Sequence, residues 1–261
     1  MLKPSVKYLG RVAVVRVPRG STLDLTEFAR EIMMRNSGVE TVLEIERVEG
    51  PYRVPVVRHV AGSLDTVTTV KEDGIVYTFD ASRLMFSLGN FEERRRIRSL
   101  IKPGETVVDM FAGVGQFTLP AAKSEASHVY SFEINGEAFT YLVKNIRLNH
   151  VEHKVTPYHR DCRYAVDIGL EECADRVLMG YFRETAEYLP TAFQLLKNRG
   201  GFIHFHELAE NSVGWATLYK MVSESAERCG YLVELVNKRV VKTYSPKLSH
   251  WVLDLFARRK L

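Results

Sequence analysis

The segment VVDMFAGVGQF at residues 107–117 contains the residue types that most directly indicate chemistry. An apolar strand ends here in Asp109, and a turn with Gly113 and Gly115 follows, which is how many doubly wound folds begin a nucleotide pocket. Glycine has no Cβ, so the backbone can pass close to a ligand, and the helix expected at residues 117–123 would direct its partial positive end toward that ligand. The spacing predicts a cofactor site at this turn.

The nucleotide is indicated by what this segment lacks. A dinucleotide fingerprint requires a third glycine where Thr118 stands, and a P-loop requires Gly-Lys-Ser/Thr after the turn. No phosphate therefore needs to be bound here. The carboxylate of Asp109 would repel a pyrophosphate, but it can accept a hydrogen bond from an ammonium group, which S-adenosylmethionine carries and NAD does not. The expected cofactor is S-adenosyl-L-methionine, used as a group donor.

Two further acidic positions lie where the next predicted strands end. Glu133 closes a strand at residues 129–133, 24 residues after Asp109, and a carboxylate at this place can bind both ribose hydroxyls. Asp161 and Cys162 follow the third strand, so the Asp161 side chain and the Cys162 backbone are expected at the adenine edge. Each acid alone could equally be a helix cap or a turn residue. The three at these spacings favour one pocket.

The composition limits the class of protein. With 261 residues, of which 46% are hydrophobic, the chain can bury one large core and a smaller second one. No apolar stretch approaches the ~20 residues of a membrane span, and the first residues contain no apolar block of the signal-peptide type. We expect a cytoplasmic protein that contacts no membrane. Cys162, Cys173 and Cys229 form no C-x-x-C pair, so free thiols and no metal site are expected.

The net charge of +4 is small, but the basic residues are clustered along the chain. The clusters are Arg94, Arg95, Arg96 and Arg98, then Lys238, Arg239, Lys242 and Lys247, then Arg258, Arg259 and Lys260. Any one cluster is most simply a solvated helix face or a terminal tail. Three clusters beside a cofactor domain favour an RNA substrate, because Lys and Arg bind phosphates.

Residues 1–90 are expected to form a small α+β domain, a candidate for RNA contact. Strands are predicted at residues 12–17, 41–48 and 67–79, and helical spacing covers residues 23–33. An Arg-rich helix at residues 91–100, stopped by Pro103 and Gly104, connects this domain to the rest of the chain.

Residues 91–261 are expected to form the cofactor domain. Strands beginning near residues 107, 129, 155, 176, 201, 233 and 251 alternate with helices, which predicts an α/β, doubly wound, seven-stranded sheet of the methyltransferase-like (Rossmann-like) kind. No helix separates the last two strands. They are expected to form a terminal hairpin with an antiparallel strand at the sheet edge.

The chain resembles an archaeal and eukaryotic family that modifies the guanosine beside the tRNA anticodon. The resemblance covers roughly residues 65–256 and is carried by Phe86, Ser87, Glu93, Arg94, the turn at 109–115, Glu133, Ile134, Asn135, residues 145–149, Asp161, Cys162, Arg163, residues 174–177, His204, Phe205 and His206. One branch of the family methylates guanosine N1. The other transfers the 3-amino-3-carboxypropyl group of S-adenosylmethionine to 4-demethylwyosine in phenylalanine tRNA, a step of wybutosine biosynthesis.

Two departures from the methyltransferase pattern favour the aminocarboxypropyltransferase branch. Gly180, Tyr181 and Phe182 stand where the methyltransferases have an Asn-Leu-Pro turn, and Ser87 is followed by Leu-Gly-Asn where they tend to have Ser-Pro-Arg. Losing the Asn side chain at Gly180 changes the wall beside the methionine moiety. Since the carbon that reacts is the one in line with the nucleophile within ~3 to 3.5 Å, pocket shape can change the group transferred. The resemblance thus implies release of 5′-methylthioadenosine.

The resemblance also implies roles for individual residues. The implied cofactor-binding residues are Ser87, Arg94, Asp109, Phe111, Gly113, Glu133, Asp161 and Cys162. Arg94 would pair with the methionine carboxylate, and Tyr181 and Phe182 would stack on the incoming base. Plain sheet-edge packing remains the alternative for the two aromatic residues, and a helix cap or turn for Ser87.

The residue that accepts the proton from the base stays unassigned at this stage. His204, His206 and Glu207 end a predicted strand and are candidates, but a histidine beside a strand is more often structural. Three alternative functions also stay open: an N1 or wyosine-intermediate methyltransferase, which would form S-adenosylhomocysteine; a dehydrogenase, which the missing third glycine disfavours; and a non-catalytic RNA-binding module. A monomer is expected.

Overall fold

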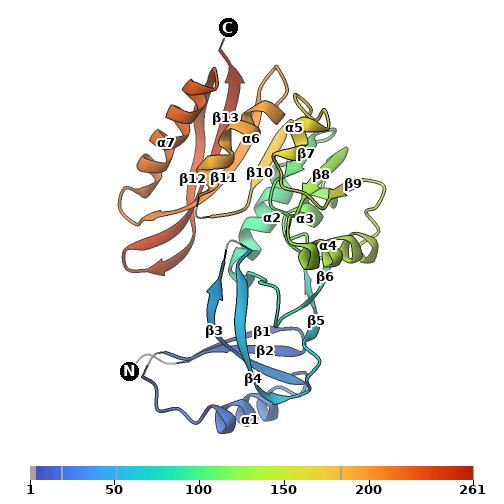
Figure 1. Cartoon of the computed structure of the whole chain (residues 1–261), viewed down its shortest axis with the longest axis vertical. Coiled ribbons are helices and arrows are strands. Elements are labelled where there is room, and N and C mark those ends of the chain that lie inside the picture. Colours follow the sequence, from blue (N-terminus) through green and yellow to red (C-terminus); the bar gives the residue numbers. More distant parts are fainter. Residues whose placement is uncertain (1–3, 19, 51, 183, 261) are drawn as a thin grey trace. The chain divides into compact units, whose positions relative to one another are not determined.

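The computed structural model describes residues 4–18, 20–50, 52–182 and 184–260 (Figure 1). The chain divides into two compact units, Met1–Ser87 and Leu88–Leu261. Each unit has its own sheet and its own buried apolar core.

The first unit is a small α+β fold. Its four-stranded sheet has the order β1-β2-β3-β4, formed by β1 (Ser5–Leu9), β2 (Val12–Arg16), β3 (Thr41–Glu49) and β4 (Val54–Gly62), and a separate hairpin follows, β5 (Val67–Glu72) and β6 (Ile75–Asp80). Helix α1 (Leu25–Arg35) begins where the Asp24 side chain accepts the backbone N–H groups of Thr26 and Glu27. The strands β1 and β4 were not predicted from the sequence.

The second unit contains a seven-stranded sheet with the order β12-β13-β11-β10-β7-β8-β9. Its strands are β7 (Thr106–Asp109), β8 (His128–Phe132), β9 (Val155–Tyr158), β10 (Arg176–Met179), β11 (Gly201–Glu210), β12 (Tyr231–Ser245) and β13 (Leu248–Arg259). Its helical elements are η1 (Leu88–Asn90), α2 (Phe91–Leu100), α3 (Thr118–Ala122), α4 (Gly136–Leu148), α5 (Tyr164–Asp167), η2 (Thr185–Tyr188), α6 (Leu189–Leu195) and α7 (Gly214–Arg228). The predicted doubly wound class is confirmed.

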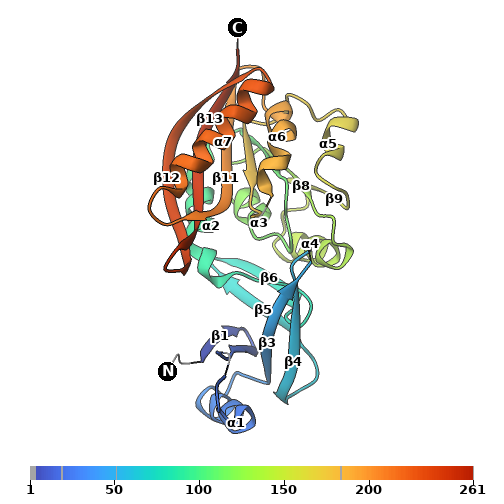
Figure 2. The same cartoon turned by 60° about the vertical axis from the view of Figure 1, so that its left-hand side comes forward.

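Helices cover both faces of this sheet. Figures 1 and 2 show α6 and α7 on one face and α2 and α3 on the other. The strands β7, β8, β9, β10 and β11 run parallel, which requires a crossover between each sequential pair and explains the alternation of strands and helices in the sequence. The order reverses direction between β7 and β10, and ligands of open α/β sheets bind at the carboxyl ends of strands at such a point.

The expected position of the antiparallel strand is wrong. The terminal hairpin exists, but β13, which runs antiparallel to both neighbours, lies inside the sheet between β11 and β12, and β12 forms the edge. The burial of the two strands explains this order. Residues 249–255 of β13 are all buried, whereas β12 alternates between partly buried and exposed residues over much of its length, as suits an edge.

Candidate functional site

The glycine turn after β7 is stabilised by the aspartate that ends the strand. Asp109 is fully buried; its Oδ2 accepts a hydrogen bond from the Thr118 hydroxyl at 2.7 Å and its Oδ1 accepts one from the Phe111 N–H at 3.3 Å. Gly113 and Gly115 have φ angles of +56° and +99°, which favour glycine. Thr118, at the place of a dinucleotide fingerprint's third glycine, therefore connects α3 to the end of β7.

The environment of Asp109 makes its carboxyl group unusually basic. Burial raises the pKa of Asp109 to about 6, against the opposing effect of the hydrogen bonds from Thr118 and Phe111, and the nearby charge of Glu133 raises it further. The two acids predicted from separate strands thus lie close enough to influence one another.

Glu133 follows β8 and joins the second strand end to the glycine turn. Its Oε2 accepts the Gly113 N–H at 2.7 Å, and its Oε1 accepts the Asn135 N–H at 2.7 Å. Burial raises the pKa of Glu133, and these backbone donors work in the opposite direction. The Asn135 side chain in turn caps α4 by accepting the N–H groups of Glu137 and Ala138. Glu133 is therefore fixed beside the turn in the place expected for a ribose-binding carboxylate.

The third strand end, at Asp161 and Cys162, is connected to the glycine turn by contacts with aromatic rings. Asp161 accepts hydrogen bonds from the Arg163 side chain at 2.9 and 2.7 Å, and these lower the pKa of Asp161. The Arg163 guanidinium lies 5.2 Å from the Tyr188 ring centroid, and the Tyr188 ring meets Phe111 edge-on at 5.0 Å. Cys162 is buried in the core, and burial raises the pKa of its thiol. The contact of Asp161 and Cys162 with adenine stays a prediction.

The segment after β10 places its two aromatic side chains in different ring clusters. Tyr181 stacks on Phe111, with ring centroids 5.2 Å apart and an interplanar angle of 25°. Phe182 instead lies 5.0 Å from the His250 ring and 6.0 Å from the Tyr244 ring. Tyr181 is therefore part of the glycine-turn site, and Phe182 faces the strands β12 and β13.

Gly180 has a steric reason to be glycine. A Cβ at this position would lie 2.7 Å from Cδ2 and Cε2 of Phe117, the residue immediately before α3. The Phe117 ring therefore occupies the space that any larger residue after β10 would need. This contact couples the end of β10 to the glycine turn after β7.

The remaining predicted residues lie at and before α2. Arg94 is almost fully buried, and its Nη1 donates a hydrogen bond to Oε1 of Gln116, a residue of the glycine turn, at 3.4 Å. Ser87 is half-buried and is the last residue of the first unit, whereas the other predicted site residues belong to the second unit. A role for Ser87 in cofactor binding stays a prediction.

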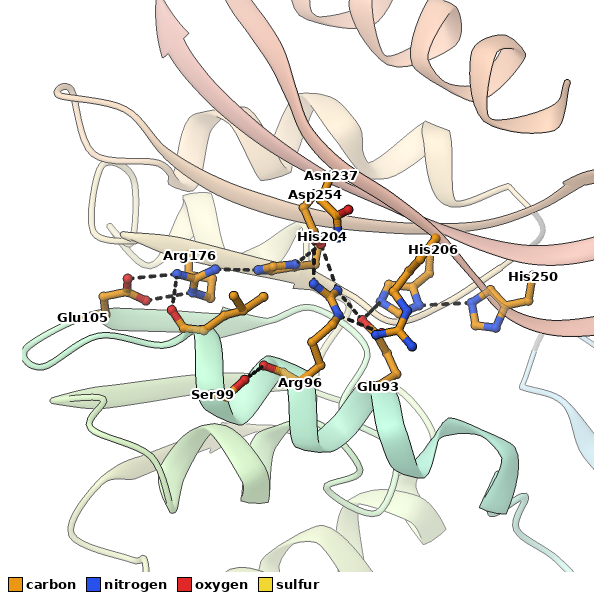
Figure 3. A network of polar contacts seen from close by, with 12 residues as sticks. Glu93, Arg96, Ser99, Glu105, Arg176, His204, His206, Asn237, His250 and Asp254 are labelled. Atoms are coloured by element: carbon orange, nitrogen blue, oxygen red, sulfur yellow. Dashed lines mark hydrogen bonds and ion pairs between the residues drawn. The ribbon is translucent and has the colours of Figure 1, made fainter.

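The candidate base His204 belongs to a buried polar network (Figure 3). Arg176 Nη1 lies 2.6 Å from His204 Nε2, and because a guanidinium can only donate, Nε2 must accept. His204 Nδ1 then carries the proton and donates to Asp254 Oδ1 at 2.6 Å. Burial lowers the pKa of His204. Both ring nitrogens are used within the fold, so His204 is a structural residue.

The other two candidate bases are also engaged inside the fold. His206 is buried, its Nδ1 lies 3.0 Å from His250 Nε2, and burial lowers its pKa to about 3. Glu207 accepts the backbone N–H groups of Thr185 at 3.1 Å and Leu208 at 2.8 Å. No proton acceptor for the base is assigned among these three residues.

Several residues of this site were not predicted from the sequence. They are Gln116, Phe117, Thr118, Tyr188 and His250. The motif spacing could have indicated Thr118, because a hydroxyl in the first turn of α3 lies near the end of β7. Tyr188 and His250 have no local signal, since their partners are distant in the sequence.

Among the described residues, no group of three or more His, Cys, Asp or Glu side chains is arranged to bind a metal ion. Within the same described ranges, none of the helices combines the length and apolar character needed to cross a membrane.

The strand order, the glycine turn and the acid after β8 together define a methyltransferase-like class of protein. The TRM5/TYW2 methyltransferase domain model matches residues 68–234, more than half of the chain. The chain belongs to the TRM5/TYW2 family, as predicted.

Two relatives illustrate the branches of this family. The tRNA(Phe) (4-demethylwyosine(37)-C(7)) aminocarboxypropyltransferase of Pyrococcus horikoshii is 38% identical over 225 residues, covering 86% of this chain and 79% of the relative. The tRNA (guanine(37)-N(1))-methyltransferase Trm5b of Pyrococcus abyssi is 32% identical over 254 residues, covering 97% of this chain and 74% of the relative.

Solved structures from both branches of the family have the same fold as this chain. The structure of P. horikoshii TYW2 in complex with MeSAdo has a TM-score of 0.85 and 33% identity, and the match covers 98% of this chain and 91% of that one. The structure of wild-type Trm5b from P. abyssi has a TM-score of 0.86 and 30% identity, with 97% and 75% coverage. Both branches therefore share the fold, and the choice between them depends on the site.

Proposed function

We propose that this protein transfers the 3-amino-3-carboxypropyl group of S-adenosyl-L-methionine to 4-demethylwyosine beside the anticodon of phenylalanine tRNA, within wybutosine biosynthesis. The observation that carries this proposal is the pair of Gly180 and Phe117: the ring excludes any larger side chain from the end of β10, where the methyltransferase pattern has Asn. Aminocarboxypropyltransferases of P. horikoshii and Methanocaldococcus jannaschii, each 38% identical to this chain, support the same branch.

The described residues of the site have the chemical groups needed to bind S-adenosylmethionine. Glu133 accepts two backbone hydrogen bonds and, as a carboxylate with several lone pairs, keeps acceptor capacity for the ribose hydroxyls. The glycine turn offers close backbone approach, and Arg94 supplies a cation beside Gln116 for the methionine carboxylate. Asp109, Phe111 and Gly113 would form the turn under the methionine tail, and Asp161 and Cys162 would contact the adenine.

The chemistry supplied by the donor is alkylation by a sulfonium. The bond between sulfur and the γ-carbon breaks with its electron pair going to sulfur, 5′-methylthioadenosine leaves, and the base carbon that bonds the γ-carbon then loses its proton. What this chain contributes is orientation. Tyr181, stacked on Phe111, and Phe182 would place the base, and positioning of this kind can supply much of the rate.

The tRNA is the expected macromolecular partner, and a complex of the related aTrm5 with tRNA(Leu) has been solved, at 26% identity to this chain. We propose that the first unit contributes to tRNA contact; Arg58 and His59 are exposed on β4, the edge strand of its sheet. We propose that the protein acts as a monomer. A tRNA substrate implies that the protein works in the cytoplasm.

The test is a product analysis. The full chain is incubated with S-adenosylmethionine and tRNA that carries 4-demethylwyosine, and the small-molecule and nucleoside products are identified by mass spectrometry. 5′-Methylthioadenosine and a base heavier by one aminocarboxypropyl group are expected. S-adenosylhomocysteine would instead assign the protein to the methyltransferase branch, and absence of cofactor binding by calorimetry would indicate an RNA-binding module.

A further inference from the structure

Two buried histidines connect the sheet to the aromatic residue that follows β10. His206 on β11 and His250 on β13 are both almost fully buried, and their rings lie 5.1 Å apart with a hydrogen bond of 3.0 Å between His206 Nδ1 and His250 Nε2. Figure 3 shows this pair at one end of the polar row between α2 and the sheet. Neither residue is among the predicted cofactor-binding residues.

The surroundings determine which histidine donates. Burial lowers the pKa of His206, so its ring is neutral and carries one proton. Its Nε2 lies 3.9 Å from the carboxylate of Glu93, which favours the proton on that nitrogen. His206 Nδ1 then accepts, and His250 donates from Nε2. This bond fixes the plane of the His250 ring, because a ring nitrogen hydrogen bond is directional.

The fixed His250 ring is in contact with Phe182. Their centroids are 5.0 Å apart at an interplanar angle of 46°, and Phe182 also meets the Tyr244 ring of β12 at 6.0 Å and 61°. Such aromatic contacts have preferred orientations, so the setting of one ring restricts the next. Phe182 lies in a segment without regular secondary structure, so backbone hydrogen bonds of a helix or strand do not hold it in place. The contacts with the rings of His250 and Tyr244 restrict the orientation of its side chain.

We propose that His250 is a positioning residue that orients Phe182 for contact with the substrate base, and that its hydrogen bond to His206 fixes it in this orientation. The proposal rests on the proposed function in one respect, namely that Phe182 stacks on the tRNA base. It adds a residue of β13, 68 positions after Phe182 in the sequence, to the determinants of tRNA recognition.

A double-mutant cycle tests whether His250 acts through Phe182. The variants are His250→Gln, Phe182→Ala and the double variant. Gln keeps an N–H for His206, so no buried acceptor is left unpaired, but it removes the ring that Phe182 contacts. His153→Gln, at an exposed turn, is the matched control. The KM values for tRNA and for S-adenosylmethionine, kcat and Tm are measured for each.

His250→Gln is expected to raise the KM for tRNA about tenfold while the KM for S-adenosylmethionine stays within about twofold, because the substitution weakens tRNA binding and leaves the chemical step unchanged. In the Phe182→Ala background, His250→Gln should have no further effect, because the coupling partner is gone. His250→Phe, which keeps a ring and loses the bond, should give a smaller rise, and it decides the question if the Gln variant does not fold.

Additive effects of the two substitutions would overturn the proposal, as would an unchanged KM for tRNA or an equal rise in both KM values. The product formed by the wild-type protein tests the proposed function independently of the role of His250. If wild-type protein forms S-adenosylhomocysteine, the aminocarboxypropyl assignment fails but the cycle is still read from that product. If no product forms, equilibrium binding of the same tRNA to the four proteins decides the role of His250.

Discussion

The two strand-end acids of this site differ in what they bind. Asp109 uses both carboxylate oxygens inside its own turn, toward Phe111 and Thr118, whereas Glu133 accepts backbone N–H groups from the turn and from the start of α4. Asp109 therefore constrains the glycine turn from within, and Glu133 connects this turn to the start of α4. Substituting one acid at a time distinguishes their two roles.

Glu133→Gln is expected to weaken S-adenosylmethionine binding about tenfold or more, because hydrogen bonds to a charged group contribute about 1.5–3 kcal/mol each. Isothermal titration calorimetry with the cofactor alone measures the change. Glu152→Gln, at an exposed turn, serves as the control and should bind like the wild type. Equal affinities for wild type and Glu133→Gln would remove Glu133 from the cofactor site.

Asp109 should make stability depend on pH. Because its folded pKa is raised to about 6, the folded protein binds a proton that the unfolded chain does not bind between the ordinary Asp pKa and pH 6. The contribution of Asp109 to the free energy of unfolding is then greatest at low pH and falls as pH rises through this window, by roughly 2–3 kcal/mol in total.

Asp109→Asn removes this titration and keeps a group able to bond Thr118. Relative to wild type, the variant should therefore gain stability between pH 4 and pH 7. Urea unfolding of the cofactor-free proteins at several pH values measures the difference. Parallel curves for the two proteins would mean that Asp109 is not the titrating group.

Gly180→Ala should destabilise the protein by about 1–3 kcal/mol, because the new Cβ would overlap the Phe117 ring. Thermal unfolding measures this, and Phe117→Leu in the same chain should recover part of the loss. Gly38→Ala, where no heavy atom lies within 4 Å of an added Cβ, is the control and should change stability little. A stable Gly180→Ala protein with unchanged turnover would show that the contact does not constrain the site.

At the scale of elements, α2 is attached to the sheet by charges as well as by apolar packing. Arg96 donates to Glu93 on its own helix and to Asp254 on β13 at 2.6 and 2.9 Å, and Arg239 Nη1 lies 3.6 Å from Glu93. Asp254 also accepts from His204 and Asn237. Burial alone would raise the pKa of Asp254, but the hydrogen bonds from His204 and Arg96 outweigh it and lower the pKa.

Arg96→Met is expected to lower the free energy of unfolding by about 3 kcal/mol, because it leaves two buried carboxylates short of a cation. Arg95→Met changes the next residue of the same helix, whose partner Glu92 is exposed, and should have little effect. Denaturant unfolding of both variants gives the comparison. Similar losses for the two would mean that the helix depends on arginine packing in general.

At the scale of the whole molecule, the net charge is only +4, but the edge strand β12 is basic. Lys238 Nζ lies 3.1 Å from the ring centroid of Trp215 on α7, and Lys242 Nζ lies 4.8 Å from the ring centroid of Tyr244 on β12, so two cations of β12 lie beside aromatic rings. Cations interleaved with aromatic rings are typical of RNA-binding surfaces.

Binding of tRNA should therefore weaken with salt. Raising NaCl from 50 to 200 mM is expected to raise the Kd for tRNA about tenfold or more, since each neutralised phosphate releases counterions. The Kd for S-adenosylmethionine, which carries no phosphate, should stay nearly constant. Filter binding and calorimetry measure the two constants, and a tRNA affinity independent of salt would contradict phosphate recognition.

The sequence by itself determined the glycine turn, the strand-end acids and the doubly wound class. These follow from local order, because sequential parallel strands joined by crossovers bring their carboxyl ends to one edge, and Asp109 and Glu133 indeed meet there. The same reasoning failed for β13, because adjacency along the chain does not decide which strand of a hairpin is inserted into a sheet.

Only the tertiary structure decided the partners of side chains that are distant in sequence. His206 and His250 are 44 residues apart, and His204 and Asp254 are 50 apart, so nothing in their spacing indicates a contact. The antiparallel pairing of β11 with β13 brings them together, since His204 lies opposite Asp254 and His206 lies diagonally across from His250. Because these side chains are buried, their polar atoms need hydrogen-bond partners within the fold. This is why His204, a candidate base in the sequence, is a structural residue in the fold.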